Sequence, residues 1–373
     1  MYIWELPDWP KFRWEDSRLI EPLGVAHRKE GWLLGSMARL GFDLKLTAEV
    51  EAVTEEALRS SEIEGEILNR ESVRSSVARR LGVPDAALAP EDRKVEGIVA
   101  MTLDATKNQA EAVTRERLFG WHAALFPTGY SGLRRIKVGQ WRDDAQGAMQ
   151  VVSGRMGRET VHYQAPPADR VESEMAAFLD WFEMPRGIDG ILHAAVAHLW
   201  FVTIHPFEDG NGRIARALAD MSLARSENSP QRFYSLASAI RRERPQYYAT
   251  LERTQKGDLD ITERLVWFVG CFSAAIDTAA EACQGVLAKA DFWQRHSLTP
   301  FNERQRKVLN RLFDGFEGKL TAQKWRALTK TSLPTAQRDI KDLVDRKVLA
   351  RNEGGSKNTS YRIVDLSIPN GKT

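Results

Sequence analysis

The chain has 373 residues, of which 43% are apolar and 28% are charged. This balance is typical of a globular protein with two or three domains, and it excludes a disordered chain. The net charge of +2 does not by itself indicate a nucleic-acid or membrane partner. Cys271 and Cys283 would lie about 18 Å apart on a helix, too far for a disulfide, so we expect free thiols and a cytoplasmic location.

The chain shows no sign of a targeting or membrane segment. Its start, MYIWELPDWPKFRW, lacks the basic region and apolar run of a signal peptide. The most apolar stretch, residues 191–204, is too short to cross a bilayer and suits a buried helix. We therefore expect no membrane partner.

In chain order, the first expected element is an irregular arm over residues 1–20, which are rich in Trp and Pro. Helical spacing begins at Pro22 and reaches about Leu81, with Gly41 and Gly82 as helix stops. It resumes from Val95, and a further helix is expected over 115–126. These helices and the arm form the first predicted domain, residues 1–90, and the beginning of the second, residues 91–290.

Residues 129–167 differ, because glycines separate short runs of β-forming residues. This pattern predicts one or more β-hairpins. The pattern then returns to helices, which are expected at about 169–184, 188–204, 211–225, 244–256 and 261–289. A polar linker over 290–305 leads to a third predicted domain at 300–373. The expected fold class is therefore mostly α, with a hairpin and a small C-terminal domain.

The central motif is H-P-F-E-D-G-N-G-R-I-A-R, residues 205–216. Pro206 ends the apolar helix before it, because proline disfavours the α conformation at the preceding residue. Gly210 and Gly212 allow a tight turn, and Asn211 between them suits an N-cap or a left-handed position. A turn of this kind at a helix N-terminus forms an anion site.

The charged residues of the motif indicate phosphoryl-type transfer. Arg213 and Arg216 lie three residues apart, so they share one helical face and can clamp phosphate. Asp209 can hold a Mg²⁺ ion that binds phosphate. His205 lies where a base is needed to take a proton from an attacking hydroxyl. The alternative interpretation of each residue alone is structural, but together they indicate a Mg²⁺-bound nucleotide as substrate.

Residues 205–216 match every specified position of the Fic family signature, so the chain resembles that family. The resemblance implies a Fic-type helical core that transfers AMP from ATP to a Ser, Thr or Tyr hydroxyl of a protein. It implies the following roles: His205 is the base, Asp209 holds Mg²⁺, Gly210, Asn211 and Gly212 cradle the phosphates, Arg213 and Arg216 orient the β- and γ-phosphates, and Phe207 anchors the loop.

Two further segments resemble the substrate-binding parts of the family. The hairpin region at 129–167 is similar to the flap, whose edge would hold a target segment by β-augmentation, with Met149–Val152 expected at its tip. The alternative is a surface hairpin without a partner. The stretch R-P-Q-Y-Y-A-T-L-E-R-T-Q resembles the adenine pocket, where Tyr248 and Gln255 would contact the base. The alternative for these two side chains is ordinary packing.

The stretch R-S-S-E-I-E-G-E-I-L resembles the inhibitory helix of one Fic class through Ser60, Glu64 and Gly65. The resemblance implies that Glu64 pairs with Arg216 and takes the place of the γ-phosphate, since both anions need the same guanidinium donors. The alternatives are that Glu64 is a solvated carboxylate or that it positions a water for removing AMP from a modified protein.

Residues 321–373 carry eleven Lys and Arg residues against five Asp and Glu residues. Their helix–turn–helix–strand pattern resembles a winged-helix module, with E-G-G-S-K-N-T as the wing turn. Thr335, Gln337 and Arg338 would then approach a DNA groove, and Lys357 a phosphate. The alternative is a protein-docking or homodimer element.

Two functions remain open from the sequence. The first is an autoinhibited adenylyltransferase that modifies a target protein, including itself. The second is a DNA-binding regulator in which the Fic core is a minor activity. Other family members transfer phosphate, UMP or phosphocholine, and the presence of both arginines favours a triphosphate.

Overall fold

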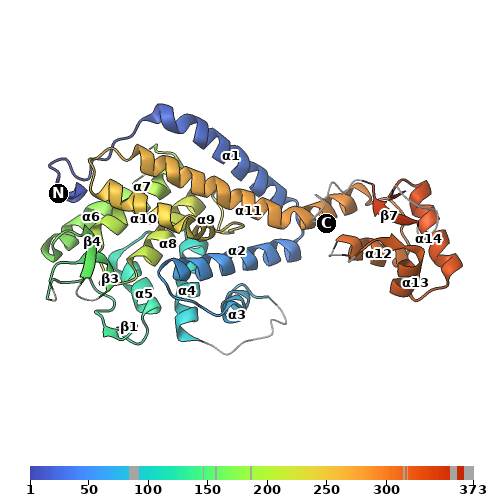
Figure 1. Cartoon of the computed structure of the whole chain (residues 1–373), viewed down its shortest axis with the longest axis horizontal. Coiled ribbons are helices and arrows are strands. Elements are labelled where there is room, and N and C mark those ends of the chain that lie inside the picture. Colours follow the sequence, from blue (N-terminus) through green and yellow to red (C-terminus); the bar gives the residue numbers. More distant parts are fainter. Residues whose placement is uncertain are drawn as a thin grey trace. The chain divides into compact units, whose positions relative to one another are not determined.

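In a computed structural model, the protein is mostly helical, with 64% helix and only small sheets (Figure 1). This confirms the expected mostly α class. The structure describes residues 1–83, 92–145, 147–155, 158–184, 187–313, 316, 318–352 and 359–364. The chain folds into two compact units, and the first contains most of the predicted N-terminal segment and most of the predicted core. The first unit is Met1–Met37 with Gly41–Ala280, and the second is Ala38–Leu40 with Glu281–Thr373.

The N-terminal segment contains a short 3-10 helix followed by helices: η1 (Ile3–Glu5), α1 (Asp16–Ala38), α2 (Phe42–Ile63) and α3 (Arg70–Arg80). The arm before α1 is packed rather than free, because the buried Trp4 donates from Nε1 to the carbonyl of Gln164 at 2.8 Å.

The helix boundaries in this segment agree only in part with the prediction. Gly41 is the N-cap of α2 and Gly82 follows α3 with φ of 72°, so both predicted stops are confirmed. The predicted start at Pro22 is wrong, since α1 begins six residues earlier and accommodates the proline in its second turn. The break at residues 64–69, between α2 and α3, was also not predicted.

The core of the first unit is built on α7 (Gly190–Ile204) and α8 (Asn211–Ser226), which pack against each other. Nearly every residue of α7 is buried. A helix that is buried on all sides carries apolar residues around its whole circumference and not on one face only. This explains the continuous apolar sequence of α7. The remaining helices of this unit are α4 (Arg93–Lys107), α5 (Arg115–Leu125), α6 (Ala168–Glu183), α9 (Leu236–Arg242), α10 (Arg244–Gln255) and the first part of α11 (Thr262–Arg295).

Helix α11 is longer than predicted. It runs to Arg295, so the first part of the expected linker at 290–305 is helical. Its stretch Thr262–Gly285 is long and apolar enough to cross a membrane by length and composition, but half of its most apolar window is buried inside the protein. Phe268 and Phe272 are fully buried there. A helix buried in a protein core can be as long and as apolar as a membrane-spanning helix. The burial of this stretch therefore accounts for its apolar composition.

Two antiparallel hairpins confirm the β prediction for 129–167: β1 (Tyr130–Ser131) with β2 (Arg134–Arg135), and β3 (Gln150–Arg155) with β4 (Arg158–Gln164). The predicted tip at Met149–Val152 is wrong. Gln150 pairs with Gln164 at the open end of the hairpin, and the pairing ends at Arg155 with Arg158 at the other end. Met149 and Val151 are apolar because they pack at the base of the hairpin, against a cluster that includes Trp4 and Tyr163.

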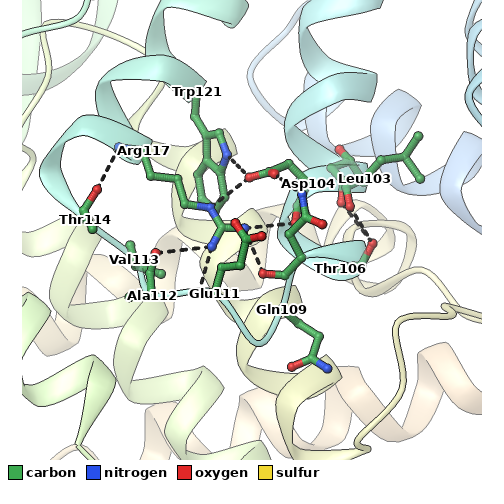
Figure 2. Close-up of polar contacts among 12 residues, drawn as sticks. Leu103, Asp104, Thr106, Gln109, Glu111, Ala112, Val113, Thr114, Arg117 and Trp121 are labelled. Carbon is green, nitrogen blue, oxygen red and sulfur yellow. Dashed lines mark hydrogen bonds and ion pairs between the residues drawn. The ribbon is translucent and has the colours of Figure 1, made fainter.

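Helices α4 and α5 are joined by a partly buried network around Arg117, shown in Figure 2. Arg117 and Trp121 both donate to Asp104 Oδ2, at 2.9 and 2.7 Å. The same guanidinium donates to carbonyl oxygens at the end of α4, including those of Asp104 and Asn108. The carbonyl of Asp104 also accepts from the amide of Asn108, the C-cap of α4, so Arg117 adds a second donor at this helix end. The network therefore holds α5 in place, and His122 on α5 contacts the central motif at residues 205–216.

The second unit contains helices and a three-stranded sheet of order β5-β7-β6 around Trp325 and Leu343. Residues 353–358 of the predicted wing turn, which include Lys357, lie outside the described residues. The winged-helix assignment stays a prediction. The elements are α12 (Glu303–Phe313), β5 (Leu320–Thr321), α13 (Ala322–Thr329), α14 (Leu333–Asp345), β6 (Leu349–Arg351) and β7 (Ser360–Ile363).

Candidate active site

The motif loop, residues 205–210, connects α7 to α8 and begins in an uncommon backbone conformation. His205 is the C-cap of α7 with φ of 54° and ψ of 56°, a left-handed region that few non-glycine residues occupy. Its amide still donates to the carbonyl of Phe201 at 3.0 Å, whereas Pro206 has no N–H to continue the helix. The chain therefore leaves α7 at the histidine itself.

The imidazole of His205 has a defined tautomer. Nδ1 lies 3.2 Å from the carbonyl oxygen of Val202. Because a carbonyl can only accept, Nδ1 carries the proton and Nε2 keeps its lone pair. The side chain is half-buried, and burial lowers the pKa of the imidazole to about 4. His205 is therefore neutral near pH 7 and can accept a proton on Nε2.

Asn211 braces the motif loop from inside. Its Oδ1 accepts from the amide of Phe207 at 2.9 Å, and its Nδ2 donates to the carbonyl of Phe207 at 2.8 Å. The prediction that Asn211 is an N-cap or left-handed residue is wrong, because Gly210 is the N-cap of α8 with φ of 83°. A Cβ on Gly210 would lie 2.9 Å from the ring of Phe126, so only glycine fits there. Phe207 is fully buried, as expected of an anchor.

His122 on α5 supports the far end of the motif loop, and sequence reasoning did not find it. Gly139 donates its amide to His122 Nδ1 at 3.1 Å, so the proton is on Nε2, which donates to the carbonyl of Asp209 at 3.2 Å. The ring also stacks on Phe207 with 4.2 Å between centroids. Burial lowers the pKa of His122 to about 4, so this support is a neutral one.

The carboxylate of Asp209 lies at the mouth of the loop with 40% of its side chain exposed. It accepts from Ser131 on β1 and from the amide of Gly210, and Arg213 is 3.7 Å away. Among the residues described, no three His, Cys, Asp or Glu side chains form a metal-binding group. A single exposed carboxylate fits a Mg²⁺ ion, which typically takes one or two protein carboxylates and completes its shell with phosphate oxygens and water.

The first turn of α8 provides an anion site. Its amides have no partner within the helix, and the helix dipole favours negative charge there. Arg213 and Arg216 are buried beside it, at 6% and 1% exposure. Arg213 Nε and Arg216 Nη1 have no hydrogen-bond partner. Leaving buried N–H groups unpaired is costly, so these donors mark a place for acceptor oxygens.

Three predicted inhibitory residues lie at this anion site. Arg216 donates to Ser60 Oγ at 2.9 Å, to the Ser60 carbonyl at 2.7 Å and to Glu64 Oε1 at 2.8 Å. Glu64 is the C-cap of α2, and Gly65 turns the chain away with φ of 86°. A Cβ on Gly212 would lie 2.1 Å from Glu64 Oε1, so the carboxylate rests directly on the first turn of α8.

A second carboxylate, Glu66, holds the other motif arginine. Its Oε2 lies 2.9 Å from Arg213 Nη1, and its Oε1 lies 3.5 Å from Lys94 Nζ. Sequence reasoning missed Glu66, although the alternation of Glu62, Glu64 and Glu66 was a usable signal. Glu62 instead pairs with Arg59 on its own helix and with Arg241.

The two residues expected at the adenine differ in their surroundings. The Tyr248 hydroxyl donates to the carbonyl of Ile63 at 3.2 Å, and its ring is 38% exposed. Tyr248 therefore lies beside the end of α2, next to Glu64. Gln255 is buried against α7 and donates to Thr203 Oγ1 at 3.3 Å. Their role toward a base stays a prediction.

Two segments of the chain match known family models. Residues 112–223 match the Fic/DOC family model, and residues 2–83 match a domain of unknown function, DUF4172. The chain therefore contains a Fic/DOC family domain, and it has homologues named as adenylyltransferases.

The curated relatives match only parts of the chain. Protein adenylyltransferase Fic of Nematostella vectensis is 28% identical over 217 residues, which are 56% of this chain and 45% of that protein. Protein adenylyltransferase fic-1 of Caenorhabditis briggsae is 40% identical over 91 residues, 24% of this chain and 17% of that protein. The chain thus spans less than half the length of these relatives.

A solved structure matches nearly the whole chain. The Fic family protein from Desulfovibrio desulfuricans covers 94% of this chain, with 96% of its own length matched. The TM-score is 0.55 and the identity is 20%, so this likeness shows the fold alone.

Proposed function

We propose that this protein is an autoinhibited protein adenylyltransferase, which moves AMP from ATP to a Ser, Thr or Tyr hydroxyl of a target protein. The observation that carries the proposal is the position of Glu64. Its carboxylate occupies the anion site between Gly212 and Arg216, beside the neutral imidazole of His205. An anion site that is already filled by the protein's own carboxylate is suited to regulated binding of a phosphate.

The reaction follows from the site residues. The target hydroxyl gives its proton to His205 Nε2 as its oxygen bonds to the α-phosphorus of ATP. The bond from that phosphorus to the bridging oxygen breaks, and pyrophosphate leaves. Arg213 and Arg216 neutralise the charge of the departing phosphates. Asp209 is the residue that would hold Mg²⁺, which would supply further charge neutralisation to the triphosphate.

Inhibition follows from competition for the same donors. While Glu64 binds Arg216, the γ-phosphate loses both the guanidinium and the first turn of α8. Glu66 likewise binds the guanidinium of Arg213, which is then less available to the phosphates. We call residues 60–66 the inhibitory segment. ATP bound beside it would be misplaced for in-line attack.

The test is labelling of a cell lysate and of the purified protein with ATP carrying ³²P at the α-phosphate. Glu64→Gly is expected to label target protein and itself severalfold more strongly than the parent. Glu62→Gln is the matched control from the same helix end, because Glu62 binds Arg59 and Arg241 instead. Glu64→Gly combined with His205→Ala is expected to transfer nothing. Equal labelling by parent and Glu64→Gly would contradict the inhibition.

The same labelled protein tests the related function of AMP removal. If parent protein, but not Glu64→Gln, releases AMP from a purified modified target, Glu64 positions water for that reaction. This outcome would make the enzyme bifunctional.

The C-terminal unit supports DNA binding as a second candidate function. On α14, Ala336 and Asp339 face the core, while Gln337 and Arg338 are exposed beside Lys341. Exposed basic and amide side chains on one helix are suited to a DNA groove. We expect the full chain to bind duplex DNA less tightly as salt rises, and Arg338→Ala to weaken that binding. Absence of binding at low salt would favour protein docking.

A further inference from the structure

Arg142 lies outside the motif, in the segment between β2 and β3, and its side chain is fully buried. Its guanidinium reaches acceptors from separate parts of the chain. Nε donates to the carbonyl of His205 at 2.8 Å, Nη1 lies 3.1 Å from Asp144 Oδ1, and Nη2 donates to the carbonyl of Pro166. Because all three guanidinium nitrogens form hydrogen bonds, this buried arginine is held in one position.

These bonds act on the backbone that carries His205. The amide of Arg142 donates to the carbonyl of Pro206 at 2.9 Å, while its guanidinium holds the carbonyl of His205. Two successive carbonyls of the motif loop are therefore held by one residue. The direction of the imidazole depends on the left-handed backbone of His205, because a change in that backbone would turn its Cβ elsewhere.

The other bonds of Arg142 connect the loop to neighbouring elements. Pro166 follows β4 of the hairpin, and Asp144 Oδ2 accepts from the amide of Ala168, the first residue of α6, at 2.7 Å. Arg142 thus joins the end of α7, the exit of the hairpin and the start of α6. It contacts none of Gly212, Arg213 and Arg216 in the hydrogen bonds and ion pairs of the described residues.

We infer that Arg142 is a positioning residue that aims the imidazole of His205 at the target hydroxyl. This inference rests on the proposed function, because it assigns His205 the role of base. The inference assigns different roles to two parts of the site. The arginines and glycines of α8 bind the triphosphate, whereas Arg142 sets the geometry of proton transfer. Loss of Arg142 should therefore lower kcat without a matching loss of ATP affinity.

The charge of Arg142 adds a second, measurable effect. Arg142, Glu64 and Asp209 are the charged groups whose electrostatic interaction with the imidazole shifts its pKa. Burial is the main cause that lowers the pKa of His205, and Arg142 lowers it further, whereas the two carboxylates raise it. Replacing Arg142 by a neutral residue should raise this pKa, while lysine should leave it lowered.

The experiment compares Arg142→Lys and Arg142→Gln, each in the Glu64→Gly protein so that transfer is measurable. We expect kcat to fall at least tenfold in both and the Kd for ATP to change less than twofold. The acid limb of the pH profile should move upward only in Arg142→Gln. Arg115→Gln, which removes an exposed arginine paired with Glu172, is the matched control and should change neither constant. A kcat within twofold of the control, or a Kd that weakens as much as kcat falls, would overturn the inference.

A second measurement keeps the inference testable if Glu64→Gly transfers no AMP. NMR titration of the imidazoles, with His205 assigned by the His205→Ala difference, reports the tautomer and pKa directly. An unchanged His205 signal in Arg142→Gln would count against the inference, whereas a raised pKa would support it. If Arg142→Gln does not fold, Asp144→Asn removes one partner of the guanidinium. Asp144→Asn should lower kcat by a smaller factor than is expected for Arg142→Gln, and it should leave ATP affinity unchanged. An unchanged kcat would again overturn the inference.

Discussion

Glu64 Oε1 lies 2.8 Å from Arg216 Nη2, although 152 positions separate the two residues in the sequence. The pair joins the end of α2 to the first turns of α8. Arg216 is almost fully buried, and its Nη1 has no partner. The guanidinium is thus held from one side by the inhibitory segment and still has an unused donor on the other.

Replacing Glu64 by glutamine should raise ATP affinity about tenfold or more. The amide keeps the shape of the side chain but loses its charge, and a hydrogen bond to a charged group contributes about 1.5–3 kcal/mol. Isothermal titration with Mg²⁺ and ATP measures the change. Similar affinities for the parent and for Glu64→Gln would show that this carboxylate does not compete with phosphate.

Replacing Glu66 by glutamine should have a smaller effect in the same direction, about threefold in the Kd for ATP. Glu66 is more exposed than Arg213 and is shared with Lys94, and exposed ion pairs contribute about 0.2–1 kcal/mol. Because Glu64 and Glu66 hold different arginines, the double variant should bind ATP more tightly than Glu64→Gln alone. If the double variant binds ATP no more tightly than Glu64→Gln alone, the inhibition comes entirely from the contact of Glu64 with Arg216.

Replacing Gly212 by alanine in the Glu64→Gly protein should abolish measurable ATP binding. The added Cβ would lie 2.1 Å from the position of Glu64 Oε1, which is the position proposed for a phosphate oxygen. Gly120→Ala is the control, since a Cβ at that helical glycine meets no atom within 4 Å. Retained ATP binding in Gly212→Ala would move the phosphate away from this turn.

The pH dependence of kcat/KM for ATP should remain flat well below pH 6.5. His205 must be neutral to accept a proton, and burial lowers its pKa from 6.5 to about 4. His205 is therefore already neutral between pH 6.5 and about pH 4, and kcat/KM falls only as the pH approaches 4. Measurement in the Glu64→Gly protein reports the free enzyme. A half-maximal value near pH 6.5 would mean that the catalytic imidazole is solvated.

Much of the candidate site could be predicted from the sequence because its parts are local. The motif at residues 205–216 contains its own helix end, turn and helix start, and these depend on proline and glycine at fixed spacing. The apolar run before it predicted a buried helix, and α7 is one. The contact of Ser60 and Glu64 with Arg216 was expected from a resemblance and not from spacing.

The tertiary structure alone decided which distant side chains complete the loop. His122 and Arg142 contact it from other segments, and no periodicity in the sequence marks either residue. Glu66 contacts Arg213 on α8. Their roles depend on how α5, the hairpin and the end of α2 pack around α7 and α8. Asn211 was misassigned for the same reason, since its amide binds Phe207 across a turn whose shape depends on the packing of Phe126 against Gly210. Local patterns determine where helices begin and end, whereas packing determines which buried polar groups meet.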